Sequence, residues 1–190
     1  MIAFEKLGLS SDIIDTLKNK GFKKPTAIQE KTIPLLLKGE VDVIGQAQTG
    51  TGKTASFSLP VIETITPGTG YVQALVLAPT RELAIQVSTE IDSLRGKRPI
   101  SVLPIYGGSS ITHQIKVLRK GVDIVVGTPG RIMDLMRRKE LHLKNVSFLI
   151  LDEADEMLDM GFLEDIEWIL SHTPEEKRML FFSATMPRPI

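Results

Sequence analysis

The sequence predicts an α/β protein in which a parallel β-sheet is flanked by helices on both faces. Six short runs rich in valine, isoleucine and leucine alternate with amphipathic segments of helical period. Continuous apolar runs are typical of parallel strands, because helices cover both faces of such a sheet. Polar, small or charged residues follow every run, and open parallel sheets bind ligands beyond the carboxyl ends of their strands. We therefore expect one rim of the sheet to carry the functional residues.

Each expected element has its own signal. A helix over residues 10–20 starts at Ser10 and stops at Gly21, and a second helix over residues 25–37 opens with Pro25. The expected strands are residues 41–44, 74–78, 100–105, 123–126, 148–151 and 179–182. The later helices are expected at residues 53–65, 82–94, 111–119, 131–136 and 163–170. Residues 1–38 would thus form N-terminal helices, and residues 39–190 the core of the same domain.

Composition narrows the class of protein. The 190 residues suffice for one sizeable domain, and 23 basic residues balance 23 acidic ones, so any nucleic-acid surface must be a local patch or rely on backbone N–H groups. The absence of cysteine excludes disulfides and thiolate metal sites and fits a reducing cytosol. The N-terminus lacks the features of a signal peptide, and no apolar run approaches membrane-spanning length. We therefore expect a cytoplasmic protein without a membrane partner.

The segment after the first strand has the pattern of a phosphate-binding loop. Small residues (Ala47, Gly50 and Gly52) lead to Lys53 and Thr54 and then to a helical pattern. Backbone N–H groups at a helix N-terminus bind polyphosphate, the lysine reaches the β- and γ-phosphates, and the threonine hydroxyl helps to hold Mg²⁺. The alternative is a glycine-rich connector without a ligand, which the Gly-Thr-Gly-Lys-Thr ending disfavours.

Two adjacent carboxylates, Asp152 and Glu153, directly follow the fifth strand. Beside a phosphate-binding loop, the first carboxylate is placed to hold Mg²⁺ and the second to orient the attacking water. Alternatively, the acidic stretch only opens the next helix, where carboxylates interact favourably with the helix dipole. The loop upstream favours the catalytic interpretation.

Other polar residues have weaker signals. Gln29 carries a donor and an acceptor and could read the N6/N7 edge of adenine, and Phe4 could stack on the base. The residue pattern alone, however, favours a surface glutamine and a core phenylalanine.

Ser183 and Thr185 could hydrogen-bond to Asp155, although hydroxyls at a strand end satisfy local backbone equally well. The three histidines match no metal-ligand spacing, and the basic residues 137–139 are interpreted as a favourable helix end.

Phosphate-holding groups follow several other strands. Hydroxyls, guanidinium groups and helix N-termini hold phosphates without reading base sequence, and glycines allow a nucleic-acid backbone to approach. Each group alone also fits an ordinary capped helix start. Together they predict a backbone-binding site formed by Pro79, Thr80, Arg81, Gly107, Gly108, Thr128, Pro129, Gly130 and Arg131.

Taken together, these motifs resemble the DEAD-box RNA helicases, and in particular the first of their two RecA-like domains. The resemblance runs from Phe4 to Thr185. It covers the Q motif at residues 21–29, the loop at residues 47–54, and the segments Pro-Thr-Arg-Glu-Leu, Gly-Gly, Thr-Pro-Gly-Arg, Asp-Glu-Ala-Asp and Ser-Ala-Thr. It implies a RecA-like P-loop fold, the cofactors ATP and Mg²⁺, and a monomeric ATP-dependent RNA helicase that binds single-stranded RNA by its backbone.

The resemblance also implies a role for each site residue. Phe4 and Gln29 would select adenine, against the interpretation that the pattern alone favours. Lys53, Asp152 and Glu153 would be catalytic, and Thr54 and Asp152 would hold Mg²⁺ largely through water. Asp155, Ser183 and Thr185 would couple the ATP state to RNA engagement. The expected ATP-binding residues are Phe4, Gln29, Ala47, Gln48, Thr49, Gly50, Thr51, Gly52, Lys53 and Thr54.

The sequence stops at Ile190, and the second RecA-like domain of the family, with its arginine finger, is expected to be missing from it. We therefore expect the 190 residues alone to bind adenine nucleotides weakly, to hydrolyse ATP poorly and not to unwind RNA. Two other classes stay open: a different P-loop enzyme, such as a DNA helicase or a small-molecule kinase, and a non-catalytic scaffold.

Overall fold

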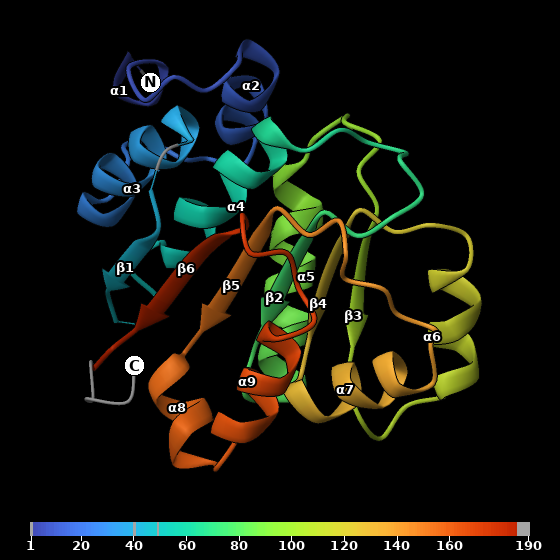
Figure 1. Ribbon diagram of the computed structural model, residues 1–190. Helices are drawn as coiled ribbons and strands as arrows, with labels where there is room; N and C mark the ends of the chain where they lie inside the picture. The colour runs from blue at the N-terminus through green and yellow to red at the C-terminus, as the bar shows by residue number, and fades with distance from the viewer. Residues whose placement is uncertain (1, 40, 49, 186–190) are drawn as a thin grey trace.

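The computed structural model describes residues 2–39, 41–48 and 50–185 and contains a six-stranded sheet in which every neighbouring pair is parallel. The strand order is β1-β6-β5-β2-β4-β3 (Figure 1). The strands are β1 (Val43–Gln46), β2 (Ala74–Leu77), β3 (Val102–Ile105), β4 (Ile124–Gly127), β5 (Phe148–Asp152) and β6 (Arg178–Ser183). The predicted parallel α/β fold is confirmed.

Helices cover both faces of the sheet. In Figure 1, α7 and α9 lie on one face, whereas α4 and α5 lie on the other and the N-terminal helices pack beyond α4. The helices are α1 (Ile2–Glu5), α2 (Ser11–Asn19), α3 (Ala27–Lys38), α4 (Lys53–Thr64), α5 (Arg81–Leu94), α6 (Ile111–Leu118), α7 (Pro129–Arg137), α8 (Ala154–Asp159) and α9 (Leu163–Leu170). In the part of the chain that the structure describes, no helix combines the length and the apolar character needed to cross a bilayer.

Two hydrophobic clusters form the core, one on each face of the sheet. Strand residues alternate between them: Ala74 and Val76 of β2 belong to the first cluster, and Leu75 and Leu77 to the second. This alternation follows from the two-residue period of a strand, and it explains why a doubly covered strand is apolar throughout. The first cluster also contains buried residues of α1, α2 and α3, so the N-terminal helices share the core of the sheet.

The first strand begins two residues later than predicted. Val41 is exposed, and Asp42 uses its carboxylate to accept a hydrogen bond from the Met179 N–H at 2.7 Å. Pairing with β6 then starts at Val43, opposite Leu180, and extends to Gln46. Ile44 is exposed as well, and β1 alternates buried and exposed residues, so the expectation that this run is covered on both faces is wrong. The register of the strand depends on its neighbour, which the run itself does not reveal.

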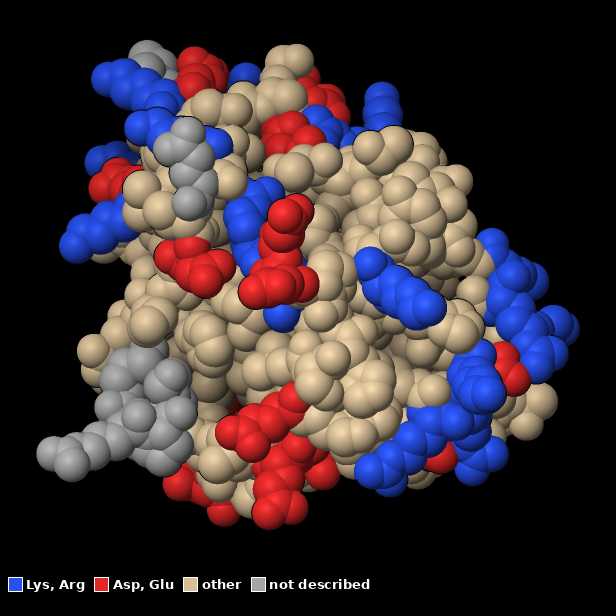
Figure 2. Space-filling model, viewed as in Figure 1, with Lys and Arg blue, Asp and Glu red and all other residues tan. Residues whose placement is uncertain are grey.

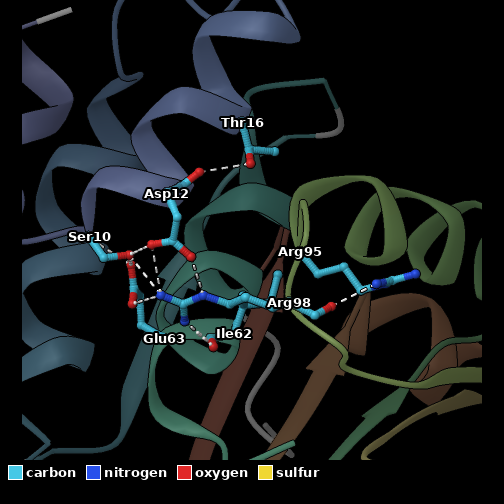
Figure 3. A network of polar contacts seen from close by, with 7 residues as sticks. All are labelled: Ser10, Asp12, Thr16, Ile62, Glu63, Arg95 and Arg98. Atoms are coloured by element: carbon cyan, nitrogen blue, oxygen red, sulfur yellow. Dashed lines mark hydrogen bonds and ion pairs between the residues drawn. The ribbon is translucent and has the colours of Figure 1, made fainter.

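Arg98, in the loop after α5, fastens the N-terminal helices to the sheet domain (Figure 3). Its guanidinium donates to Asp12 Oδ2 at 2.8 Å, to Glu63 Oε2 at 2.7 Å and to the Ile62 carbonyl at 2.8 Å. It also donates to Ser10 Oγ at 2.7 Å. Because Asp12 lies on α2 and Glu63 on α4, one side chain joins the two helices.

Candidate functional site

The loop between β1 and α4 contains two glycines in the left-handed conformation. Gly50 has a φ of 80° and Gly52 a φ of 83°. Residues that carry a side chain rarely adopt this backbone conformation, and a Cβ at residue 52 would also lie 2.4 Å from Gln29 Nε2. Both the left-handed φ and the close approach of Gln29 therefore require glycine at residue 52, directly before α4 begins at Lys53.

The rest of this loop is held by its own backbone and by β6. The Ala47 N–H donates to the Ser183 carbonyl at 3.0 Å, and the Thr51 hydroxyl donates to the Gln48 carbonyl at 2.7 Å. Thr49, which was predicted to bind ATP, lies outside the residues that the structure describes. The loop therefore starts at the carboxyl edge of the sheet and ends at a helix N-terminus, where backbone N–H groups attract anions.

A buried cluster of one cation and two carboxylates lies beside the loop. Lys53 Nζ is 3.0 Å from Asp152 Oδ1 and 2.5 Å from Glu153 Oε1. The three residues are only 4, 1 and 8% exposed, respectively. Asp152 is the last residue of β5, and Glu153 follows it with a left-handed φ of 54°, just before α8. Glu153 is the N-cap of α8 but makes no side-chain capping hydrogen bond, and Asp155 and Glu156 lie in the first turn, so the alternative interpretation, in which the acids open a helix, also fits part of this stretch.

The charges in this cluster depend on one another. Burial lowers the pKa of the Lys53 ammonium, but the charge of Asp152 and the hydrogen bonds to both carboxylates outweigh burial and raise the pKa above its ordinary value. Burial also raises the pKa of Asp152, and the neighbouring ammonium offsets only part of that rise. If Lys53 moved away, Asp152 would need another cation to stay ionised in this buried position.

The cluster lines a cavity of about 280 Å³ that is large enough for part of a nucleotide. The lining residues are Phe22, Gly50, Gly52, Lys53, Thr54, Ala55, Leu83, Gln86, Glu90, Asp152 and Glu153. Asp152 Oδ1 is buried, and the Lys53 ammonium lies 3.0 Å from it. A carboxylate oxygen and the Thr54 hydroxyl are oxygen ligands that suit Mg²⁺, which keeps several waters and takes few protein ligands. These residues therefore fit the predicted ion.

Within its described residues, the structure contains no group of three or more histidine, cysteine, aspartate or glutamate side chains that could hold a metal ion.

Gln29 is 1% exposed, so the interpretation of this residue as a surface glutamine is wrong. Its side-chain oxygen accepts from the Thr26 N–H at 3.0 Å, and its side-chain nitrogen donates to the Gly52 carbonyl at 3.0 Å. In this structure Gln29 thus ties the start of α3 to the phosphate-binding loop. Its predicted contact with adenine stays a prediction.

Phe4 is fully buried, as the residue pattern alone suggested, and belongs to the core cluster. Its ring meets Phe22 edge to face, with the ring centroids 6.1 Å apart. Phe22 is half-buried and lines the cavity beside the loop, whereas Phe4 lies behind it. Phe22 is a site residue that the pattern did not single out, although it stands within the Q motif at residues 21–29.

The predicted hydrogen bonds between α8 and the end of β6 are present. The Asp155 N–H donates to Ser183 Oγ at 3.2 Å, and the Thr185 N–H and hydroxyl donate to Asp155 Oδ2 at 2.9 and 2.8 Å. Burial raises the pKa of Asp155, but hydrogen bonds from the hydroxyls of Ser183 and Thr185 outweigh it and lower the pKa to about 2. The acid loop and the last strand are therefore one connected unit.

The rim beyond β2 and β3 presents one stacked arginine and two open glycines. Arg81 lies over the Tyr106 ring, 4.9 Å from its centroid, and Thr80 caps α5 by accepting from the Leu83 N–H at 3.2 Å. Gly107 and Gly108 are exposed, and a Cβ at residue 107 would meet no atom within 4 Å. Pro79, which precedes Thr80, is buried, and its predicted contact with RNA stays a prediction.

The next part of the rim is the N-terminus of α7. Pro129 is the first residue of α7 and is buried, Gly130 is exposed, and Thr128 makes no side-chain capping bond. Arg131 Nη1 donates to Gln114 Oε1 at 3.2 Å and to the Ser109 carbonyl at 3.4 Å, which joins α7 to α6. The predicted rim residues therefore come from neighbouring elements, and Tyr106 and Gln114, which the sequence did not point to, hold the two arginines.

The family model described as DEAD/DEAH box helicase matches residues 26–190. This chain belongs to the DEAD/DEAH box helicase family. The stretch Asp152-Glu153-Ala154-Asp155 that carries the buried acids also spells the DEAD sequence. The predicted family is thereby confirmed.

Several DEAD-box proteins are similar to the whole chain. The DEAD-box ATP-dependent RNA helicase CshA of Geobacillus kaustophilus is 55% identical over 190 residues, which are 100% of this chain and 40% of that protein. A probable ATP-dependent RNA helicase of Methanocaldococcus jannaschii is 55% identical over 187 residues, which are 98% of this chain and 50% of that protein. The chain thus spans half or less of the length of these relatives.

A solved structure supports the same assignment. The crystal structure of a DEAD box protein from the hyperthermophile Methanococcus jannaschii matches with a TM-score of 0.94 and 54% sequence identity. The match covers 98% of this chain and 51% of that one. The RecA-like fold predicted for this DEAD-box chain is therefore confirmed.

Proposed function

We propose that this chain is the nucleotide-binding domain of an ATP-dependent RNA helicase. It would bind ATP with Mg²⁺ in the cavity beside Lys53 and a single RNA strand along the neighbouring rim. The observation that carries the proposal is the buried cluster of Lys53, Asp152 and Glu153, which lines a cavity at a helix N-terminus. The similar proteins are themselves named ATP-dependent RNA helicases.

The geometry suggests how each residue of the cluster would act. Lys53 would exchange its two carboxylates for the β- and γ-phosphates, which leaves Asp152 in need of a cation. Asp152 and Thr54 would hold Mg²⁺, largely through water, and the bound ion supplies charge neutralisation at the phosphates. Glu153, released from the ammonium, would orient the attacking water and accept its proton, which yields ADP and phosphate.

For the base, we propose that Phe22 offers its open face to adenine while Phe4 supports it from behind. Gln29 would recognise adenine if its side-chain nitrogen released the Gly52 carbonyl. The rim loops at Arg81, at residues 107–108 and at residues 128–131 would hold RNA phosphates. Asp155, Ser183 and Thr185 would then transmit the nucleotide state to that rim, because they connect α8 to the end of β6.

In the whole protein, hydrolysis would drive local separation of RNA duplexes together with a second RecA-like domain, and the protein would act as a monomer in the cytoplasm. The lack of cysteine agrees with that compartment. A membrane partner is not part of the proposal.

The decisive test substitutes Lys53→Ala in the full-length protein, with the exposed Lys97→Ala as the matched control. We expect Lys53→Ala to abolish RNA-stimulated ATP hydrolysis and Lys97→Ala to leave it unchanged, with circular dichroism confirming that both variants fold. If the Lys53→Ala variant kept its activity in the cell and in solution, the protein would act as a non-catalytic scaffold rather than as an enzyme. Stronger stimulation by DNA than by RNA would instead indicate a DNA helicase.

A further inference from the structure

Charge is distributed unevenly along this neutral chain. Residues 111–144 hold eight basic and three acidic residues, whereas residues 145–190 hold three basic and ten acidic ones. Figure 2 shows the consequence on the surface, where blue side chains gather over α6 and the end of α7 on the right and red ones near α8 at the bottom. The chain therefore has a local positive field although its net charge is zero.

An ion pair brings the ends of α6 and α7 together. The Arg119 guanidinium, just after α6, lies 2.5 and 3.0 Å from the two oxygens of Glu140. Lys139, with a left-handed φ of 60°, turns the chain between α7 and Glu140. This contact gathers seven exposed cations into what we call the basic corner: Lys116, Arg119, Lys120, Arg137, Arg138, Lys139 and Lys144.

The arginines and the lysines of the basic corner differ in their partners. Arg119 pairs with Glu140, Arg138 pairs with Asp134 at 2.8 Å, and Arg137 lies over the Trp168 ring. The four lysines of the corner form no ion pair with any residue that the structure describes. Their charges are therefore available to an outside anion.

A favourable helix end does not account for all of these cations. Basic residues interact with the helix dipole only within the last turn of a helix. Lys116 lies in the last turn of α6, but Lys144 lies in the segment between α7 and β5, outside any helix. Seven cations from two helices and a connecting segment exceed what two helix ends need, so the interpretation of residues 137–139 as a helix end alone is incomplete.

The basic corner continues the rim that was proposed to hold RNA. Both α6 and α7 start at that rim, close to Gly108 and within residues 128–131, and both end at the corner. Arg131 joins the two starts through Gln114, as Arg119 joins the two ends through Glu140. The nine residues of α7 span about 13 Å, or about four stacked nucleotides of one strand.

We propose that the basic corner is a second RNA contact, which holds the phosphates that flank the strand segment bound at the rim. The proposal rests on the proposed function, because it needs RNA at the rim, and it deepens it by extending the site along α6 and α7. Lysines act on phosphates as point charges, so the contact is independent of sequence and weakens as the salt concentration rises.

The test compares uridine oligonucleotides of about 6 and about 20 residues by fluorescence anisotropy, at salt concentrations between about 50 and 200 mM. One triple variant combines Lys120→Gln, Lys139→Gln and Lys144→Gln. Its matched control combines Lys6→Gln, Lys31→Gln and Lys38→Gln, which removes the same charge from exposed lysines among the N-terminal helices. Arg81→Ala serves as the variant of the rim.

We expect the basic-corner variant to bind the long oligonucleotide about ten-fold more weakly, with a salt slope smaller by about 2, because each lost contact with a single strand contributes about 0.7. The short oligonucleotide should bind equally to both triple variants and lose affinity only with Arg81→Ala. Equal binding of the long oligonucleotide by both triple variants would overturn the basic corner and leave the proposed function standing. The basic corner would also be overturned as an RNA contact if the basic-corner variant lost only its binding to phosphatidylserine vesicles, which would indicate a lipid surface. If the unaltered chain bound neither oligonucleotide, the proposed function itself would fail.

Discussion

At the level of single residues, the most informative feature is that Lys53 is already paired. Its ammonium lies within 3.0 Å of Asp152 and 2.5 Å of Glu153 in a site from which water is largely excluded. A buried ion pair is costly to break by removing one partner, so in the proposed function ATP would offer the lysine phosphates at the same time as a cation reaches Asp152. This explains why a nucleotide and its metal ion would be expected to bind together.

The substitution Glu153→Gln separates the contribution of Glu153 to ATP hydrolysis from any contribution to ATP binding. Glutamine keeps the size of the side chain but cannot accept a proton, and Lys53 keeps Asp152 as its partner. We expect the turnover number of the full-length protein to fall by roughly 10² to 10⁴-fold while the dissociation constant for ATP changes little. Glu156→Gln, an exposed acid on α8, is the control. Equal turnover in the two variants would remove Glu153 from the mechanism.

Asp155 makes stability depend on pH. Its folded-state pKa of about 2 lies below the unfolded value of about 4, so its contribution is present above pH 4 and is lost as the pH falls towards 2. Since the carboxylate is partly exposed, we expect the loss to be only about 1 kcal/mol. Denaturant unfolding at about pH 5 and about pH 3 should therefore show a smaller acid effect in Asp155→Asn than in the unaltered chain. Identical pH dependence would contradict the hydrogen bonds from Ser183 and Thr185.

At the level of elements, the phosphate-binding loop and the N-terminal helices depend on each other. Gly50 and Gly52 share the left-handed conformation, but only at residue 52 would a Cβ collide with Gln29. We expect Gly50→Ala to cost about 1 kcal/mol of backbone strain, and Gly52→Ala to cost more and to weaken ATP binding by displacing Gln29. Thermal unfolding and an ATP titration of both variants measure this difference. Similar ATP affinities would show that Gln29 does not support the loop.

Arg98 is the other link between these elements. Arg98→Ala leaves Glu63, which is 12% exposed in its side chain, without its guanidinium partner and releases Asp12 of α2. We expect a loss of about 2 to 3 kcal/mol in the free energy of unfolding, against less than about 0.5 kcal/mol for Lys18→Ala, which removes an exposed pair within α2. Arg98→Lys should recover only part of the lost free energy of unfolding, because an ammonium cannot donate to four separate groups in one plane. Equal losses for Arg98→Ala and Lys18→Ala would contradict this role.

How much the sequence predicts also differs between elements. The strands and long helices follow from apolar periodicity, and the predicted helix at residues 163–170 coincides with α9. The four-residue α1 has too few turns to show a period, so it was not predicted. The buried position of Gln29 and the contacts of Arg98 depend on partners 23 and 86 residues away, Gly52 and Asp12, and no local pattern contains that information. The same holds for Phe22, whose role as a cavity wall depends on Phe4 packing behind it.

At the level of the whole molecule, the cavity combines residues from separate segments of the chain. Its lining residues come from the loop before α3, from the phosphate-binding loop and α4, from α5 and from the end of β5. The described lining contains Lys53 but no arginine. Phosphoryl transfer gains roughly 10³ to 10⁵ in rate from an arginine that stabilises the transition state. In the proposed function, the second RecA-like domain supplies that group.

The 190-residue chain and the full-length protein are expected to differ in ATP binding and in ATP hydrolysis. Phe22, Gln29 and the loop glycines are present in the chain, so we expect it to bind ATP, although weakly, because the contacts of the proposed second domain would be absent. Hydrolysis should be slower by about 10³-fold or more and should not respond to RNA, because an arginine finger would be absent from the cavity. Titration with a fluorescent ATP analogue and a phosphate-release assay, each with and without about 20 nucleotides of oligouridine, measure the two properties separately. Robust RNA-stimulated turnover by the chain alone would show that its catalytic site is complete, and the need for a second domain would be refuted.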